Sequence, residues 1–398
     1  MKYPVKRLSV EELNKEPFCP EQPTIYEIIW GKTKYELLVN YVPNSRKMAA
    51  FGTGTVNRNR GLPDFKRNSW YPDIPVTSIW YADPTLYEGE LSLYWYYGTN
   101  KRWHLKNIAF LLAAIAKKHM ISLEDSLFFG SSGGGYSSLV LATLLHGKAY
   151  VINPQIFLEN YFEAHYKKFL ADVLSKGEKP AEERISIISL FKAERYIPRI
   201  HYVQNMQSVH DIRLQVTPFL RGISEGNMDC SDTISMEFFY AEGGHNAMPD
   251  KDRSLVLIAR GLEDKATGVA INADEEKHQK LTFFERVSCA DFKNTGTYLL
   301  FDELDEFGAV YKGAKTEISS GNLCYDLAIP KRSVSGYTFS YYLMADKVTA
   351  AKLPYSDSTK AEFKLLSPGR YKIKCFVLKD DAKLSFVSDE ITVKSTDV

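Results

Sequence analysis

The stretch Gly130-Ser131-Ser132-Gly133-Gly134-Gly135 decides the fold of this chain. The apolar residues 127–129 before it predict a strand, and the apolar pattern of residues 136–145 after it predicts a helix. The stretch fits the pattern G-x-S-x-G, in which a serine on a tight strand-to-helix turn exposes its hydroxyl above a parallel sheet. Neighbouring glycines relieve the crowding that such a turn creates. Ser132 is therefore the candidate nucleophile.

The surrounding sequence must decide the role of this motif, because a surface loop rich in glycine and serine would look the same. Strand and helix patterns alternate on both sides of it. Strands are expected at 24–31, 34–42, 47–51, 76–82, 148–152, 201–205 and 236–241, and helices at 107–120 and 253–262. This alternation predicts an α/β fold with a doubly wound, mostly parallel sheet and Ser132 at the carboxyl end of a central strand.

Two further regions depart from this alternation. Helical spacing over about 156–199 predicts inserted helices, which would either cap the site or only pack beside it. After a polar linker at 275–280, residues 283–398 form short alternating runs between turns, which predicts an all-β, Ig-like sandwich. We therefore expect a first domain over 1–268 and a second over 281–398. The second domain is either a module that binds a ligand or protein partner or a packed appendage.

Composition excludes several classes of function. The 398 residues carry a net charge of +1, which gives no general attraction to nucleic acid or to an anionic membrane. No apolar segment reaches the roughly 18 residues that a transmembrane helix needs, and the N-terminus lacks the apolar region of a signal peptide. The five cysteines are scattered, which indicates reduced thiols and a cytoplasmic location.

Cofactor motifs are incomplete. Gly31-Lys32-Thr33 resembles the end of a phosphate-binding loop, but Tyr26 replaces the glycine that the motif requires. Gly52-Thr53-Gly54 resembles the start of a dinucleotide-binding loop, but Asn57 replaces its third glycine. Histidines and cysteines lack the spacing of common metal sites. We expect no bound cofactor and no metal.

The candidate base is His245, which follows the last predicted strand of the sheet on the loop Gly243-Gly244-His245. Its position fits the chain order serine, acid, histidine. The acid is expected after strand 201–205, where Asp211 is the single carboxylate of residues 206–213. Arg213 offers Asp211 a structural partner instead. Two carboxylates nearer the last strand remain as alternatives, Asp229 and Asp232.

Backbone N–H groups are expected to stabilise a developing oxyanion. One is that of Gly133 at the start of the helix, and the others belong to Thr53 and Gly54 in the turn after the third strand. Basic side chains follow that turn and would meet an anionic substrate or the phosphates of an acyl carrier, or would only be solvated: Arg58, Arg60, Lys66 and Arg67. The aromatic residues 94–97 would either stack on a sugar or pack inside the protein.

With these motifs assembled, residues 24–265 resemble the α/β-hydrolase superfamily. Residues 129–136, 202–205 and 243–245 are similar to bacterial proteins encoded with cell-surface polysaccharide systems. These include capsule O-acetyltransferases of α/β-hydrolase type and the serine-hydrolase-like component of the accessory Sec system. The resemblance implies a triad of Ser132, Asp211 and His245. It also leads us to expect an acid soon after Gln204-Asn205, where Ser208 stands instead.

The sequence thus predicts serine acyl-ester chemistry through an acyl-enzyme. Water as acceptor would make the protein an esterase, and a sugar hydroxyl would make it an O-acyltransferase. The resemblance favours a bacterial cell-surface carbohydrate as substrate, with acetyl-CoA as the acyl donor in the case of transfer. The alternative is a catalytically weak or inactive hydrolase-fold scaffold that binds glycan or protein partners in polysaccharide or glycoprotein export.

Overall fold

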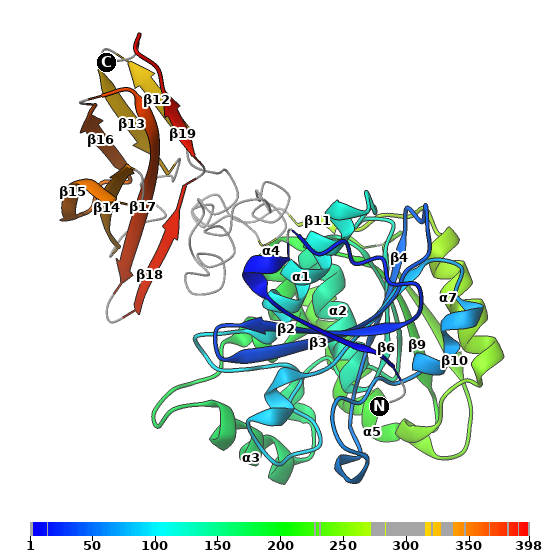
Figure 1. The fold of residues 1–398 in the computed structure, drawn as a ribbon. Helices are drawn as coiled ribbons and strands as arrows, with labels where there is room; N and C mark the ends of the chain where they lie inside the picture. The colour runs from blue at the N-terminus through cyan, green and yellow to red at the C-terminus, as the bar shows by residue number, and fades with distance from the viewer. Residues whose placement is uncertain are drawn as a thin grey trace. The chain divides into compact units, whose positions relative to one another are not determined.

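The computed structural model describes residues 3–13, 15–226, 228–230, 232–271, 283, 315–319, 321–327, 337–345, 348–365, 367–379, 382–388 and 390–396 (Figure 1). The chain divides into two compact units, Met1–Ala273 with Thr282–Phe284 and Asp274–Leu281 with Glu285–Val398. The expected boundaries at 268 and 281 stay predictions, because most residues between them are not described. The expected linker at 275–280 and an alternating run at 296–301 also lie outside the described residues.

A nine-stranded sheet organises the first unit, in the order β1-β2-β3-β5-β4-β6-β7-β9-β10. From β5 to β10 all neighbours are parallel, whereas β2, β3 and β5 pair antiparallel. The strands are β1 (Val5–Ser9), β2 (Thr24–Trp30), β3 (Thr33–Asn40), β4 (Met48–Gly52), β5 (Thr77–Tyr81), β6 (Leu127–Ser131), β7 (Lys148–Ile152), β9 (Arg199–Asn205) and β10 (Ile234–Phe239). The predicted mostly parallel α/β sheet is confirmed.

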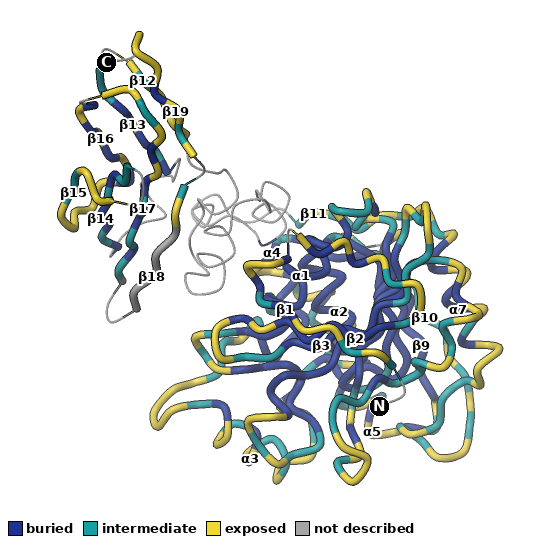
Figure 2. Tube along the Cα trace, viewed as in Figure 1, coloured by how far each residue is buried: buried dark blue, intermediate teal, exposed yellow. Residues whose placement is uncertain are grey.

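Helices cover both faces of this sheet (Figure 1). On one face α2 (Gly133–Leu145) packs against β4, β6 and β7 and contacts α1 (His104–Lys118) and α4 (Ile187–Glu194). On the other face α7 (Lys251–Glu263) lies against β6 and β7. Its Leu257 and Ile258 join a buried apolar cluster with Phe51, Phe129 and Val203 from the strands. Figure 2 shows in dark blue that the strands in the middle of this sheet are buried. Each such side chain contributes about 1.5–3 kcal/mol when it leaves water.

The segment after β9 is helical, although the sequence pattern predicted a loop at residues 206–213. It comprises α5 (Val209–Asp211), a π-helical turn (Ile212–Val216) and α6 (Thr217–Glu225). Pro218 lies at the start of α6 and has no N–H for the carbonyl of Leu214 four residues earlier. The side-chain amide of Asn160 donates to that carbonyl at 2.7 Å instead. A contact from a distant segment therefore supports this irregular helix, and local sequence cannot predict such a contact.

The inserted region contains η5 (Leu158–Asn160), α3 (Glu163–Val173), η6 (Glu182–Arg184) and α4. The aromatic residues 94–97 pack against it, with the ring of Trp95 5.3 Å from that of Tyr161 and 5.0 Å from that of Phe169. All four side chains of the run are buried. The sugar-stacking role considered for them is therefore wrong, and they fix α3 to the sheet unit.

The second unit is all-β over its described residues. One antiparallel sheet has the order β12 (Lys315–Ser319), β13 (Asn322–Asp326), β16 (Lys360–Lys364). The other has the order β15 (Val348–Ser356), β14 (Thr338–Ala345), β17 (Gly369–Lys379), β18 (Ala382–Val387), and β19 (Ile391–Val393) also pairs with β17. The rings of Tyr325 and Tyr341 join the two sheets with centroids 6.3 Å apart. An all-β domain is confirmed, and the Ig-like type stays a prediction.

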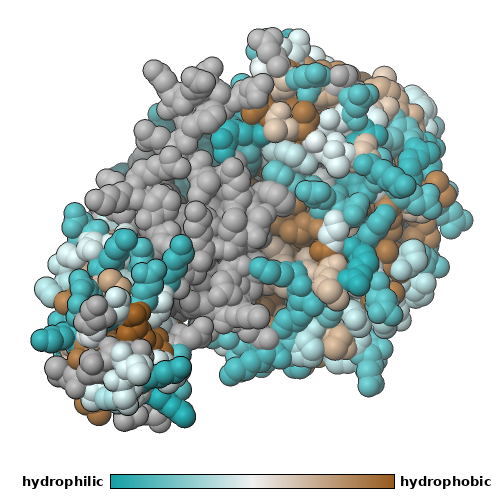
Figure 3. All heavy atoms as spheres, turned by 90° about the horizontal axis from the view of Figure 1, so that it is seen from above, coloured by the Kyte–Doolittle hydropathy of each residue, from teal (hydrophilic) through white to brown (hydrophobic). Residues whose placement is uncertain are grey.

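The surface of the described residues has ordinary polarity. Hydrophilic side chains cover much of the face drawn in Figure 3, with smaller apolar groups between them. Within the described ranges, no helix has both the length and the apolar character needed to cross a membrane. Four of the five tryptophans are buried within the first unit: Trp30, Trp80, Trp95 and Trp103.

Candidate active site

The turn from β6 to α2 holds Ser132 in a strained backbone conformation, with φ 54° and ψ −126°. The N–H of Ser132 donates to the carbonyl of Ile152 on β7 at 3.1 Å, which fixes the turn to the sheet. Glycines permit the close packing around it, since a Cβ on Gly134 would lie 2.5 Å from the carbonyl oxygen of Gly52. A Cβ on Gly130 would lie 2.2 Å from the carbonyl oxygen of Gly134. The turn therefore has the geometry expected of a nucleophile elbow.

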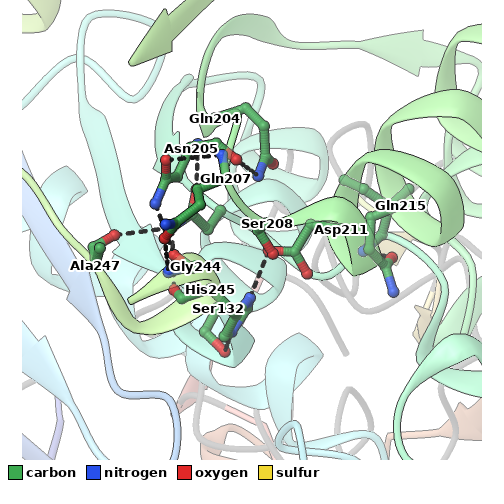
Figure 4. Close-up of polar contacts among 12 residues, drawn as sticks. Ser132, Gln204, Asn205, Gln207, Ser208, Asp211, Gln215, Gly244, His245 and Ala247 are labelled. Atoms are coloured by element: carbon green, nitrogen blue, oxygen red, sulfur yellow. Dashed lines mark hydrogen bonds and ion pairs between the residues drawn. The ribbon is translucent and has the colours of Figure 1, made fainter. Parts of the chain in front are cut away.

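The structure brings Ser132, His245 and Asp211 together (Figure 4). His245 Nε2 lies 2.8 Å from Ser132 Oγ, and His245 Nδ1 lies 2.7 Å from Asp211 Oδ2. Asp211 is buried at the end of α5, and its Oδ2 also accepts a 2.7 Å hydrogen bond from Ser208 Oγ. Ser208, where the resemblance led us to expect an acid, thus supports the acid three residues later.

The other acid candidates lie elsewhere. Asp229 and Asp232 do not line the cavity around Ser132. The carbonyl of Asp232 accepts a 2.8 Å hydrogen bond from Arg199. Arg213, the alternative partner of Asp211, is exposed and forms no ion pair with it in the described part of the chain. Asp211 is therefore the carboxylate that meets His245.

Amide side chains hold the loop that carries His245 (Figure 4). Asn153, after β7, donates to the carbonyls of His245 and Ala247, both at 3.0 Å. Asn205, at the end of β9, donates to the carbonyl of Gly244 at 2.8 Å, and Gln207 accepts from the N–H of Gly244 at 3.0 Å. No role of these amides was predicted from the sequence. Their place at the carboxyl ends of parallel strands was the available signal.

The expected oxyanion donors are only partly brought together. The N–H of Thr53 donates to Tyr96 Oη at 2.8 Å, and Thr53 is buried away from the cavity, so its expected role is wrong. Gly54 lies beside the start of α2, where its Cβ would be 3.5 Å from the nitrogen of Gly133. Gly54 also lines the cavity. The role of Gly54 and Gly133 as oxyanion donors stays a prediction.

A cavity of about 780 Å³ opens onto Ser132. Most of its wall comes from the loops after β4, β6, β9 and β10, with the start of the inserted region on one side. Its lining residues include Thr55, Trp70, Gln155, Tyr161, Phe162, Val209, His210, Asn246 and Met248. The site thus lies at the carboxyl ends of the strands, the usual place for ligands in parallel α/β sheets.

The four basic residues near the site have different environments. The guanidinium of Arg58 donates to backbone carbonyls of the loop after β5 and is structural. Lys66 also lines the cavity but pairs with Asp64 at 2.6 Å, and Arg60 is exposed. Arg67 reaches the cavity, where its Nη2 donates to Ser131 Oγ at 2.8 Å. Burial lowers the pKa of Arg67 to about 10, so the side chain stays charged at neutral pH.

The strand order and the strand-to-helix turn at Ser132 are those of an α/β-hydrolase-type fold. No family model matches the sequence, and a search of curated proteins found no match. Among solved structures, the chain is similar to the capsule O-acetyltransferase of Neisseria meningitidis serogroup A, with 14% identity and a TM-score of 0.41. That match covers 59% of this chain and 96% of the other.

Two hydrolases are similar to the same extent. An S-formylglutathione hydrolase from Agrobacterium tumefaciens has 12% identity and a TM-score of 0.39, over 58% of this chain and 88% of that one. Esterase B from Lactobacillus rhamnosis has 12% identity and a TM-score of 0.41, over 64% of this chain and 89% of that one.

Proposed function

We propose that this protein is a serine enzyme that cleaves or transfers acyl groups through an acyl-enzyme on Ser132. The observation that carries the proposal is the unbroken series of hydrogen bonds from Ser132 through His245 to the buried carboxylate of Asp211. This series begins at the wall of a cavity large enough for a small ester or a sugar unit. A serine hydroxyl is a weak nucleophile by itself, and a hydrogen-bonded base held by an acid activates it.

Each member of the series has a definite part in the reaction. Ser132 Oγ forms a bond to the acyl carbon while its proton moves to His245 Nε2. Asp211 accepts the Nδ1–H of His245, which orients the ring and stabilises the imidazolium. The tetrahedral intermediate collapses, the leaving alcohol or thiol takes the proton from Nε2, and the acyl group remains on Ser132. A second acceptor then repeats these steps in reverse.

The acceptor decides between esterase and transferase. Water gives an esterase, whereas a sugar hydroxyl gives an O-acyltransferase, with acetyl-CoA as the acyl donor. Our preference for a cell-surface carbohydrate rests on the sequence resemblance, and one feature of the cavity supports it. The ring of Phe162 is exposed at the cavity and stacks with His210 at 5.8 Å between centroids. An exposed aromatic face of this kind suits the apolar side of a sugar ring.

Labelling with a fluorophosphonate probe tests the nucleophile. The folded wild-type chain should be labelled at Ser132, and Ser132→Ala should abolish the labelling without unfolding the protein. Ser175→Ala, at an exposed serine of the inserted region, is the matched control and should label like the wild type. A folded wild-type protein that does not react would instead favour the scaffold alternative.

Release of acetate from acetyl-CoA, with and without a polysaccharide acceptor, separates the two reactions. A transferase should acetylate the acceptor and hydrolyse little acetyl-CoA in its absence. Hydrolysis at the same rate with and without acceptor, and no acetylated polysaccharide, would make the protein an esterase.

A further inference from the structure

Arg67 places a positive charge in the wall of the cavity beside the candidate nucleophile. Its guanidinium lies 5.5 Å from the ring centroid of Trp70 and 5.7 Å from that of Phe129. Its Nη2 donates to the hydroxyl of Ser131, the residue directly before Ser132. Two aromatic rings and one serine therefore hold the guanidinium in place.

The carboxylates near this charge are already occupied. Asp211 accepts from His245 and Ser208, and Asp64 pairs with Lys66. Among the described residues, no carboxylate forms an ion pair with Arg67. A partly buried cation is costly unless an anion compensates it. Among the described residues, the guanidinium donates one hydrogen bond, from Nη2 to Ser131. Its remaining N–H groups have the planar, forked arrangement that fits a carboxylate or phosphate.

The backbone of Arg67 also has an unusual conformation. Arg67 has φ 63°, a left-handed conformation that is unfavourable for a side chain with a Cβ. The 3-10 helix η3 (Asn68–Asp73) begins directly after it and carries Trp70. The chain therefore adopts an unfavourable backbone state at the residue whose side chain turns to Ser131. Of the ten non-glycine residues with a positive φ among the described residues, Arg67 and Ser132 line the cavity, and strain of this kind is often found at ligand sites.

We propose that Arg67 binds an anionic oxygen group, a carboxylate or a phosphate, on the substrate whose ester reacts with Ser132. This proposal rests on the proposed function and specifies its substrate class. The anion would lie on the side of the reacting ester that faces Ser131. An acyl carrier with phosphates or an acidic sugar would both supply this chemistry.

Three acetyl esters with one common core test the proposal: methyl 4-acetoxybenzoate, 4-acetoxybenzoate and 4-acetoxyphenyl phosphate. Arg67→Gln should lower kcat/KM for the two anionic esters by roughly 10- to 100-fold, the range of one charge-assisted hydrogen bond or pair. For the neutral ester it should change kcat/KM by less than about threefold. If Arg67→Gln lowers kcat/KM more for 4-acetoxybenzoate than for 4-acetoxyphenyl phosphate, the site prefers a carboxylate, and the opposite order shows that it prefers a phosphate.

Arg60→Gln removes the same charge from an exposed position on the same segment and should leave all three rates unchanged. Equal losses on neutral and anionic esters with Arg67→Gln would overturn the proposal, since Arg67 would then only position Ser131. Should Arg67→Gln fail to fold, Arg67→Lys keeps the charge but not the fork. It should still reduce the anionic rates by several-fold more than the neutral rate, and equal effects would overturn the proposal.

Binding without turnover separates this proposal from the proposed function. Calorimetric titration of Ser132→Ala with 4-hydroxybenzoate and inorganic phosphate should show binding that Arg67→Gln in the same background weakens by roughly 10-fold or more. This binding, together with a folded wild-type protein that no fluorophosphonate labels, would support the anion site and reject the enzyme. Labelling of Ser132 without any Arg67-dependent binding or rate difference would reject the anion site alone.

Discussion

At the scale of single residues, the candidate site combines side chains from distant parts of the sequence. Ser132 comes from a strained turn, Asp211 from the first turn of an irregular helix, and His245 from a glycine loop. Ser208 supplies Asp211 with a second donor besides His245. A carboxylate with two donors is held in one orientation, and it holds the imidazole in turn.

Asp211→Asn tests this arrangement. The amide cannot accept the Nδ1–H of His245 in the same way, so the ring loses the tautomer in which Nε2 receives the serine proton. We expect kcat to fall by about 10⁴-fold, as the same change does in a known serine triad, with little change in the melting temperature. Asp252→Asn, at an exposed position of α7, is the matched control. Unchanged turnover of Asp211→Asn would assign the acid role to another residue.

At the scale of secondary-structure elements, close approach of backbones builds the site. The start of α2 lies directly on the end of β4, which leaves no space for a Cβ at Gly134. The Asn153 and Asn205 amides join the ends of β7 and β9 to the loop of His245. The turn of Ser132, after β6, and the loop of His245, after β10, are thus both held by hydrogen bonds to the intervening strands β7 and β9 of one sheet.

Gly134→Ala should therefore disturb both stability and activity. The new methyl group would collide with the carbonyl oxygen of Gly52, a backbone atom that cannot rotate away. We expect the free energy of unfolding to fall by about 1–3 kcal/mol and the labelling of Ser132 to slow. Gly369→Ala is the matched control, because its Cβ would have only a 3.7 Å contact, to Tyr371. Thermal unfolding and the labelling rate measure the two effects, and equal behaviour of the two variants would contradict this packing argument.

The strands of the structure can be compared with the strand patterns in the sequence. Strands such as 148–152 have continuous apolar runs between turn residues, and the structure places β7 at those same residues. The first strand, β1, was missed because Lys6 and Arg7 interrupt its apolar pattern at the sheet edge. The role of Thr53 was predicted wrongly because the hydroxyl that takes its N–H belongs to Tyr96, far along the chain. Contacts between residues so far apart in the chain cannot be predicted from the local sequence.

At the scale of the whole molecule, the candidate chemistry belongs to one unit. Ser132, Asp211, His245 and Arg67 all come from Met1–Ala273. Of the segment Thr282–Phe284, which also belongs to this unit, the structure describes Phe283. Its side chain is fully buried, and its N–H donates to Glu194 Oε2 at 2.6 Å.

Phe283→Ala tests whether this residue completes the first unit. Removal of a fully buried phenyl ring costs about 3–5 kcal/mol, so we expect a lower melting temperature in the full chain. A chain that ends at residue 271 should be destabilised similarly, whereas one that ends at residue 290 should retain the labelling of Ser132. Calorimetry and probe labelling measure the outcome. A chain ending at 271 as stable as one ending at 290 would show that Phe283 contributes nothing.

Because the residues of the candidate site all belong to the first unit, we expect the two units to evolve separately. Substitutions in the all-β unit do not replace Ser132, Asp211, His245 or Arg67, so we expect its sequence to diverge more freely than that of the first unit. Recombination near the boundary can exchange that unit as a cassette between genes. Relatives that keep the motifs of residues 129–136 and 243–245 are therefore expected to carry different C-terminal partners, or none.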